Sequence, residues 1–193
     1  FHTLVTLGKH DHIKIDFEDG NQMVFNDVRR FGAIDFIRSD KIVYHKWLSK
    51  LGPEPLSNNF SSLVLRKKIE NKKCSIKAAI LDQGVVSGIG NIYACEALWG
   101  AKISPYKICS KMTDQNFYDL VKELKNLLKK AINAGGSSLK DFKATGGELG
   151  YFQNLFSVYS RENLNCKRKL CNGNIKRQKQ SGRSSFFCTN CQI

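Results

Sequence analysis

Apolar and polar residues alternate through the first part of the chain in the pattern of β-strands. Between residues 13 and 17 every second side chain is apolar, which places one side of a strand against a core. Asp19-Gly20 is a hairpin turn signal, and an apolar run at 23–25 begins the returning strand. A further strand is expected at 33–37. So few strands predict a partial β-domain over residues 1–40, whose remaining strands are absent from the chain.

Residues 41–57 are predicted to link this region to the next, and they end in the proline-containing segment 51–56. Because a residue before proline prefers extended backbone, this segment predicts a stiff junction. From residue 58 the spacing of apolar residues becomes helical. We expect helices within 60–69, 76–81, 91–99 and 113–134, in a domain that spans 58–155.

The longest of these helices is predicted to begin after Thr113, whose hydroxyl can cap it, and to end at Gly135-Gly136. Its apolar residues recur with the helical period: Phe117, Leu120, Val121, Leu124, Leu127, Leu128, Ala131 and Ile132. Such a stripe is typical of a helix packed against a core, so we expect it to be structural.

The chain has 193 residues, a formal net charge of +14 and a pI near 9.5. This balance indicates a polyanionic partner, either nucleic acid or an anionic membrane surface. A hydrophobic content of 41% excludes a disordered basic tail, and no apolar run reaches the roughly 18 residues that span a bilayer. Seven cysteines without an export signal favour a reducing, cytoplasmic interior. The chain starts at Phe1 rather than Met, which suggests a piece of a longer protein.

Four cysteines near the C-terminus form two close pairs, Cys166 with Cys171 and Cys188 with Cys191. This spacing is typical of a four-thiolate zinc site, in which two short turns each supply two ligands of a tetrahedron. Between residues 161 and 191 stand eight basic residues and one acidic residue. A metal-held hairpin this basic is suited to a polyanion.

Two disulfides in a secreted chain are the alternative for these four cysteines. They would leave Cys74, Cys95 and Cys109 as an odd set, and no signal peptide precedes them. The zinc site is therefore the favoured interpretation.

A glycine-rich segment at 82–94 lies between two predicted helices. Gly84, Gly88 and Gly90 allow tight turns, and Asn91 is placed to cap the helix that follows. The free N–H groups of that helix end make an anion site, and the Asn91 amide could itself donate to a phosphate. No strand precedes the glycines, so a dinucleotide-binding or P-loop interpretation fails. A plain structural turn remains the alternative.

Three sequence motifs accompany the four cysteines in this chain: Arg-Arg-Phe-Gly at 29–32, Leu-Gly-Pro-Glu-Pro-Leu at 51–56 and Gly-Ile-Gly-Asn-Ile-Tyr-Ala at 88–94. In this combination the chain resembles the formamidopyrimidine-DNA glycosylase family of base-excision repair enzymes, which includes endonuclease VIII. The resemblance covers essentially all of the chain. The stretches 135–142 and 147–153 look more like the formamidopyrimidine branch than endonuclease VIII.

The resemblance implies an α+β fold: a partial N-terminal β-sandwich over 1–40, a helix–two-turn–helix domain over 58–155 and a zinc ribbon over 156–193. A lesion-capping loop is expected near 140–151. In the family, DNA lies in the cleft between the two halves. The implied partner is double-stranded damaged DNA, bound by a monomer.

Asn91 and the N–H groups beside it resemble the family's phosphate grip. Arg183 matches the arginine at the ribbon tip, which holds phosphate around the damaged nucleotide and is also described as the proton donor of a late elimination step. Because a guanidinium has a pKa above about 12, we give more weight to charge stabilisation than to proton donation. The four cysteines match the ligands of one structural zinc ion. The first pair is Cys-x4-Cys where the family has Cys-x2-Cys, so a bulge is expected there.

Arg29 and Phe31 resemble the family loop that is pushed into the duplex, with Arg29 replacing the flipped base and Phe31 wedging a base step. His10, Lys72 and Lys77 fall on family positions that contact DNA or the lesion. Each has a simpler alternative from the residues alone. Phe31 could be ordinary core, His10 could belong to a surface cluster with its two neighbours, and Lys72 could be one of a solvated pair.

The family's nucleophile is the amine of an N-terminal proline that is followed by glutamate, and the resemblance places it upstream of Phe1. Pro53-Glu54 is internal and has no free amine. The resemblance implies a DNA glycosylase and AP lyase that removes oxidised purines, 8-oxoguanine and formamidopyrimidines, with β,δ-elimination. The 193-residue chain alone is expected to be inactive. The alternatives are a non-catalytic zinc-ribbon module that binds damaged DNA or other nucleic acid, and a general RNA-binding protein.

Overall fold

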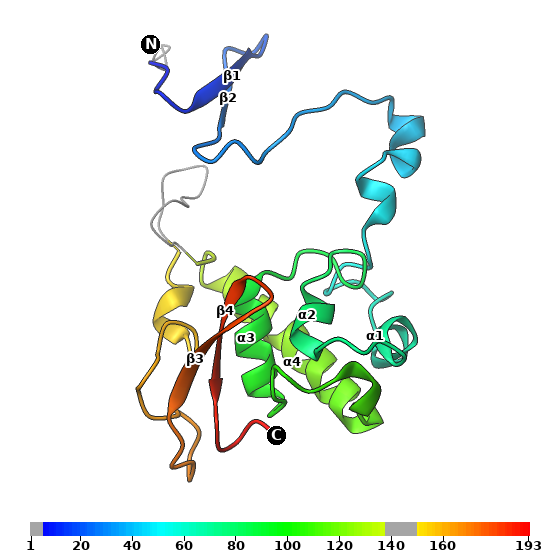
Figure 1. The fold of residues 1–193 in the computed structure, drawn as a ribbon. Helices are drawn as coiled ribbons and strands as arrows, with labels where there is room; N and C mark the ends of the chain where they lie inside the picture. Colours follow the sequence, from blue (N-terminus) through cyan, green and yellow to red (C-terminus); the bar gives the residue numbers. More distant parts are fainter. Residues whose placement is uncertain (1–5, 138–149) are drawn as a thin grey trace. The chain divides into compact units, whose positions relative to one another are not determined.

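The computed structural model describes residues 6–137 and 150–193. By contacts the chain divides into two compact units, Phe1–His45 and Lys46–Ile193, and the division falls inside the predicted linker. Figure 1 shows the helices and strands of both units.

The first unit is built on a two-stranded antiparallel hairpin, β1 (Asp11–Asp16) with β2 (Gln22–Asn26). Gly20 makes the turn with a φ of 83°, a conformation that suits glycine. A 3-10 helix follows at Ser39–Tyr44. The predicted pairing of the first two strands is therefore confirmed.

The strand predicted at 33–37 does not form in the described part of the chain. Its residues have no neighbouring strand to accept and donate backbone hydrogen bonds, and a strand is not stable without one. Phe36 accordingly remains 90% exposed. The prediction of a strand at 33–37 was therefore wrong.

The described part of the second unit contains four α-helices, whose bounds are α1 (Ser62–Ile69), α2 (Ile76–Ile80), α3 (Asn91–Gly100) and α4 (Asp114–Asn133). Short 3-10 helices lie at Leu48–Lys50, Cys109–Lys111 and Phe152–Leu155. The predicted stripe of α4 supplies much of the core, and Leu120 and Leu124 are fully buried. Ile132 is an exception at 63% exposed. It lies in the last turn of α4, beyond the main core cluster.

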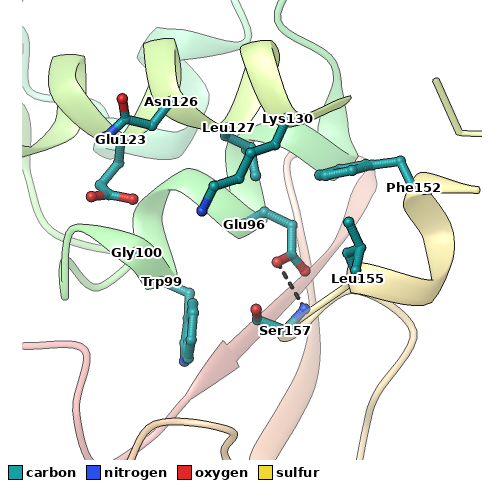
Figure 2. Close-up of a pocket in the computed structure, with 10 residues that line it drawn as sticks. All are labelled: Glu96, Trp99, Gly100, Glu123, Asn126, Leu127, Lys130, Phe152, Leu155 and Ser157. Carbon is teal, nitrogen blue, oxygen red and sulfur yellow. Dashed lines mark hydrogen bonds between the residues drawn. The ribbon is translucent and has the colours of Figure 1, made fainter. Parts of the chain in front are cut away.

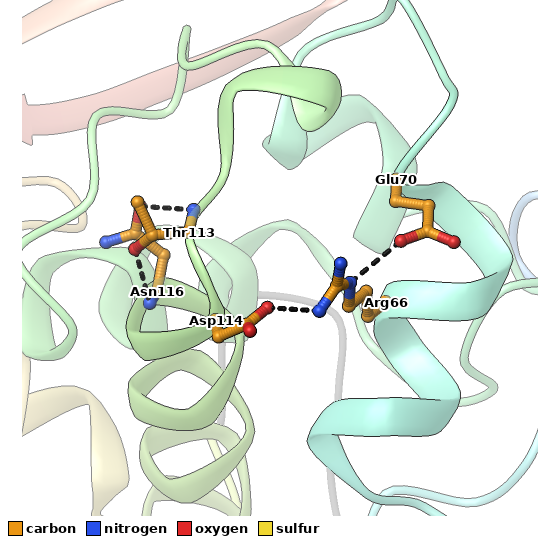
Figure 3. Close-up of polar contacts among 5 residues, drawn as sticks. All are labelled: Arg66, Glu70, Thr113, Asp114 and Asn116. Carbon is orange, nitrogen blue, oxygen red and sulfur yellow. Dashed lines mark hydrogen bonds and ion pairs between the residues drawn. The ribbon is translucent and has the colours of Figure 1, made fainter.

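The start of α4 is fixed by polar contacts with itself and with α1 (Figure 3). Asn116 N donates to Thr113 Oγ1, and Thr113 N donates to Asn116 Oδ1, both at 3.2 Å, which makes a capping box. Arg66 on α1 donates to Glu70 at 2.8 Å and to Asp114 at 2.5 Å. Asp114 stands in the first turn of α4, where a negative charge is favoured by the helix dipole.

The two ends of the segment that follows α4 are held together by the backbone. Tyr151 N donates to Ala134 O at 3.0 Å, and Phe152 N donates to Gly136 O at 3.1 Å. A Cβ on Gly150 would lie 2.1 Å from Gly136 O, so only glycine fits. These contacts form a narrow neck around residues 138–149, which lie outside the described residues together with most of the lesion-capping loop predicted near 140–151.

The C-terminal ribbon consists of β3 (Ile175–Gln180) and β4 (Arg183–Cys188), paired antiparallel. Ser181 and Gly182 form its two-residue turn with φ values of 48° and 76°, as a type I′ turn requires. β4 lies along α3 in the second unit (Figure 1). Val158, Ile175 and Phe186 are buried in the small core beneath the ribbon.

Candidate metal centre and nucleic-acid interface

The four predicted cysteines come together at one end of the ribbon. Their sulfur atoms all lie within 4.8 Å of one another. Cys166 and Cys191 are 3.8 Å apart and Cys171 and Cys188 are 3.6 Å apart, measured between sulfurs. Four thiolates bound tetrahedrally at about 2.3 Å from one ion would be separated by about 3.8 Å. The four cysteines are therefore positioned to hold a metal ion.

The cysteine thiols of this cluster have opposite pKa shifts. A hydrogen bond from the backbone of Gly173 is the main reason that the pKa of Cys171 falls to about 7. Burial raises the pKa of Cys191 to about 12. Binding a metal as four thiolates would therefore release the proton that Cys191 holds, as expected of such sites.

The metal centre is anchored to the C-terminal half of α3 by Trp99. Its indole Nε1 donates to Cys166 Sγ at 3.2 Å. Arg168 stacks over the Trp99 ring with 4.6 Å to the centroid and donates to the Trp99 carbonyl at 2.5 Å. The segment between Cys166 and Cys171 thus supplies this contact through Arg168, and it turns at Leu170, which has a positive φ of 61°.

At the opposite end of the ribbon, Arg183 is exposed at the first position of β4. The carbonyl of the next residue, Ser184, accepts hydrogen bonds from Lys77 Nζ at 3.0 Å and from Asn91 Nδ2 at 2.9 Å. Lys77 also donates to Ser185 Oγ at 2.7 Å. The ribbon tip is therefore fastened to α2 and to the start of α3.

Lys77 is 1% exposed, although it was predicted to contact DNA or the lesion. Burial lowers the pKa of its ammonium, and the nearby Cys95 thiol opposes this shift. Arg183 also lowers it, because a second positive charge disfavours the ammonium. In the described structure the Lys77 ammonium is directed to the ribbon.

The prediction that Asn91 caps α3 was wrong by one position. Gly90 is the N-cap, with the extended backbone that this position requires, and Asn91 is the first helical residue. Glycine and asparagine are both accepted at this position, so the sequence alone does not separate them. As a result the Asn91 amide is available for the ribbon, while its Oδ1 is buried without a hydrogen-bond partner.

The two-turn segment before α3 is held by Gln83, a residue whose role has no signature in the sequence. Its Oε1 accepts from Gly88 N at 2.7 Å, and its Nε2 donates to Ile89 O at 3.2 Å. Gly88 has a φ of 75°. No described atom lies within 4 Å of the Cβ position at Gly88 or Gly90. The backbone leading into α3 is thus open to a close approach, which suits an anion at a helix N-terminus.

Glu96 is a second residue that sequence reasoning missed. It is 4% exposed, and its carboxylate accepts three backbone hydrogen bonds, from Ser157 at 2.8 Å, Val158 at 2.9 Å and Tyr159 at 2.8 Å. Figure 2 shows the Ser157 bond at the edge of a pocket of about 410 Å³. Glu96 therefore joins α3 to the segment that leads into the ribbon. A lone glutamate within a helix carries no sequence signal for such a role.

In the first unit, Arg29 and Phe31 occupy a turn organised by Asp27. The Asp27 carboxylate accepts from the backbone N of Arg29 at 3.1 Å, of Arg30 at 2.9 Å and of Gly32 at 2.6 Å. These bonds lower the pKa of Asp27, with Gly32 the largest cause. The Arg29 guanidinium lies 4.9 Å from the Phe31 ring centroid. Phe31 is 80% exposed and is not a core residue of the described unit.

The two remaining residues that were predicted to contact DNA or the lesion, His10 and Lys72, are both accessible to solvent. His10 is half-buried at the base of the hairpin, where its carbonyl accepts from Asp27 N at 2.9 Å. Lys72 is exposed, and its Nζ lies 3.6 Å from Asp82 Oδ2. No helix in the described ranges 6–137 and 150–193 is long and apolar enough to cross a membrane.

Comparison with known proteins places these features in one family. Residues 51–143 match the family model of the formamidopyrimidine-DNA glycosylase H2TH domain. Formamidopyrimidine-DNA glycosylase of Dinoroseobacter shibae is 48% identical over 99% of this chain and 67% of its own length. The enzyme of a Ruegeria species is 47% identical over 99% of this chain and 68% of its own length. The chain thus spans about two thirds of the length of these relatives.

Solved structures agree with this assignment. Lactococcus lactis Fpg in complex with DNA containing an abasic site aligns with a TM-score of 0.87 at 36% identity, covering 97% of this chain and 68% of that one. The MutM (Fpg) protein of Thermus thermophilus aligns with a TM-score of 0.86 at 34% identity, covering 97% and 70%. On the strength of its sequence relatives, its helical domain and its four-cysteine ribbon, the chain belongs to the formamidopyrimidine-DNA glycosylase family.

Proposed function

We propose that this chain is the DNA-holding part of a base-excision DNA glycosylase. The observation that carries the proposal is a pair of hydrogen bonds. Lys77 and Asn91 both donate to the Ser184 carbonyl, and this holds the ribbon tip with Arg183 beside the start of α3. An exposed guanidinium next to free helix N–H groups is suited to a DNA phosphate. The structures of Lactococcus lactis Fpg with DNA that contains an abasic site or Fapy-dG support the same partner.

In this proposal duplex DNA is held by charge, and a damaged base is turned out of the stack. The net charge of +14 provides the attraction to phosphate. Arg29 and Phe31, exposed on a turn that Asp27 preorganises, would fill the space of the displaced base and wedge the neighbouring step. His10 and Lys72 would add contacts to the backbone of the DNA.

The metal that fits the four-cysteine centre is one Zn²⁺ ion with a structural role. Four thiolates without an open position are typical of structural zinc, and the sulfur separations suit its tetrahedral geometry. The ion would stabilise the ribbon and so support Arg183 at its far end.

The reaction proposed for the whole enzyme is removal of an oxidised purine, 8-oxoguanine or a formamidopyrimidine, followed by β,δ-elimination. An amine supplied from outside residues 1–193 would attack the sugar and form a Schiff base. Arg183 would then stabilise charge at the phosphate during the late elimination step. We propose that the enzyme acts as a monomer on duplex DNA in the bacterial cytosol, associated with the nucleoid, and that the 193-residue chain alone binds DNA without excising the base.

Binding to a duplex with an abasic-site analogue tests this proposal. Arg183→Ala should weaken binding by about 1–3 kcal/mol, because it removes a charge-assisted hydrogen bond to phosphate. Lys176→Ala is the matched control, since Lys176 is equally exposed on β3 but pairs with Phe187 rather than with the tip. Affinity should also fall steeply with salt. An equal loss of DNA affinity in the two variants, or an affinity that does not change with salt concentration, would contradict a phosphate site at the ribbon tip.

A further inference from the structure

Two cysteines outside the metal centre face each other across a short antiparallel contact. Ser75 and Ile108 form an antiparallel bridge. Cys109 N donates to Cys74 O at 3.0 Å, and Ile76 N donates to Lys107 O at 2.8 Å. The register therefore sets Cys74 directly opposite Cys109, with both side chains on the same side of the contact.

The geometry of this pair suits a disulfide. Directly opposed residues of a hydrogen-bonded antiparallel pair have Cα atoms about 5.5 Å apart. Disulfides usually span Cα separations of about 4.4–6.8 Å. Burial is the main cause that raises the pKa of the Cys109 thiol to about 12, and the neighbouring Cys74 thiol adds to the shift. Both cysteines are free thiols in this structure.

The two thiols differ in access to solvent. Cys74 is exposed, whereas Cys109 is 1% exposed. Among the three cysteines outside the metal centre, Cys95 is also buried at 1%. A small oxidant would therefore reach Cys74 first and would find Cys109 next to it.

We propose that Cys74 and Cys109 form a dithiol that a hydroperoxide converts into an intramolecular disulfide. The Cys74 thiolate attacks one peroxide oxygen, the O–O bond breaks, and with hydrogen peroxide a hydroxide leaves as Cys74 becomes a sulfenic acid. The Cys109 sulfur then attacks the Cys74 sulfur, the S–O bond breaks, and the oxygen leaves as water with the Cys109 proton. The peroxide is reduced by two electrons, which the two thiols supply.

The disulfide would change how the Lys72 segment is held. At present this segment is joined to the strand-like residues after Lys107 by backbone hydrogen bonds, one of which runs from Ser110 N to Lys72 O at 3.3 Å. A covalent link two residues away from Lys72 would prevent this segment from separating from its neighbour. The modification would thus fix the backbone that carries Lys72 without touching the metal centre.

Peptide mapping of the zinc-loaded 193-residue chain tests the proposal. The chain is treated with hydrogen peroxide at low molar excess, its remaining thiols are alkylated, and it is digested with trypsin. Cleavage after Lys73, Lys77, Lys107 and Lys111 releases Cys-Ser-Ile-Lys and Ile-Cys-Ser-Lys. We expect a linked pair of these two peptides, lighter than their sum by two hydrogen atoms and separated again by dithiothreitol.

Two variants and one control make the outcome decisive. The linked pair should be lost in Cys74→Ser and in Cys109→Ala, and it should persist in Cys95→Ser. Sulfinic acid at Cys74 with an alkylated Cys109 would overturn the proposal. So would Cys74-linked dimers of the chain, a disulfide to a cysteine of the metal centre, or a Cys74 that stays reduced under peroxide.

Discussion

The Lys77 ammonium donates a hydrogen bond to the Ser184 carbonyl at 3.0 Å, across 107 residues of sequence. The same ammonium reaches Ser185 Oγ, which in turn donates to Gln180 Oε1 at 2.7 Å. Gln180 Nε2 continues the chain of bonds to Ser75 Oγ at 2.9 Å. A partly buried polar network thus connects the start of α2 to both strands of the ribbon, and removing one member leaves its partners without a hydrogen bond, which is costly.

Because Lys77 lies in this network, we expect its titration to make the unfolding free energy of the chain depend on pH. Burial lowers the pKa of Lys77 in the folded chain below its ordinary value of 10.5, so the unfolded chain binds this proton more tightly. Burying the charged ammonium costs unfolding free energy. This cost is fully present below the pKa of the folded state, and it disappears as the pH rises to the pKa of the unfolded state. Between about pH 7 and about pH 10 the wild type should therefore gain unfolding free energy relative to Lys77→Met.

Urea unfolding of both proteins at the two pH values measures this difference. Both proteins should carry Cys95→Ser, because the pKa of the Cys95 thiol depends on Lys77, and the other titrating groups are shared by the two proteins. A difference between wild type and Lys77→Met that stays constant, or shrinks as pH rises, would show that the Lys77 ammonium is not desolvated.

Loss of one cysteine should release the metal. In Cys188→Ser we expect elemental analysis to find less than one zinc per chain, because Cys188 is a fully buried member of the cluster. Zinc–thiolate binding supplies much of the folding free energy of small metal ribbons. The ribbon should therefore become sensitive to protease in this variant. Cys95→Ser serves as the buried-thiol control, and full zinc content in Cys188→Ser would refute this ligand set.

Removal of the Glu96 carboxylate should loosen the junction between α3 and the ribbon. Glu96→Ala leaves three buried or half-buried backbone N–H groups without their acceptor. We expect a loss of about 1–3 kcal/mol or more in unfolding free energy. Glu123→Ala is a suitable control, because Glu123 lines the same pocket from α4 (Figure 2). Equal stability of the two variants would contradict the role given to Glu96.

Borohydride trapping separates the proposed enzyme from a non-catalytic binding module. The 193-residue chain should bind duplex DNA containing 8-oxoguanine but form no covalent adduct, because its Lys77 amine is buried and directed to the ribbon. Adding an N-terminal segment that begins with Pro-Glu should restore the adduct. An adduct formed by the chain alone would reveal an internal nucleophile, and no adduct after the addition would favour the binding module.

The parts of this site that could be predicted are those whose residues lie close together in the sequence. The metal centre could be found because each cysteine pair is close in sequence and has a recognised spacing. The hydrogen bonds to the Ser184 carbonyl could not be predicted. Lys77 and Asn91 donate to a backbone oxygen, and a backbone oxygen has no signature in the sequence. The absent strand at 33–37 shows the same limit for secondary structure, because alternation indicates a strand only when a partner is present.

The neck closed by Gly136 and Gly150 sets the separation of residues 137 and 150 for any segment that is inserted between them. Tyr151 and Phe152 fix the distance between its two ends, whatever is placed between them. Loop-closure entropy grows slowly, by about 0.6 kcal/mol for each doubling of length. Grafts of other lengths should therefore leave α4 and the metal-held ribbon intact. Such a joint makes this position suitable for the insertion of other segments by design, because the surrounding fold does not depend on them.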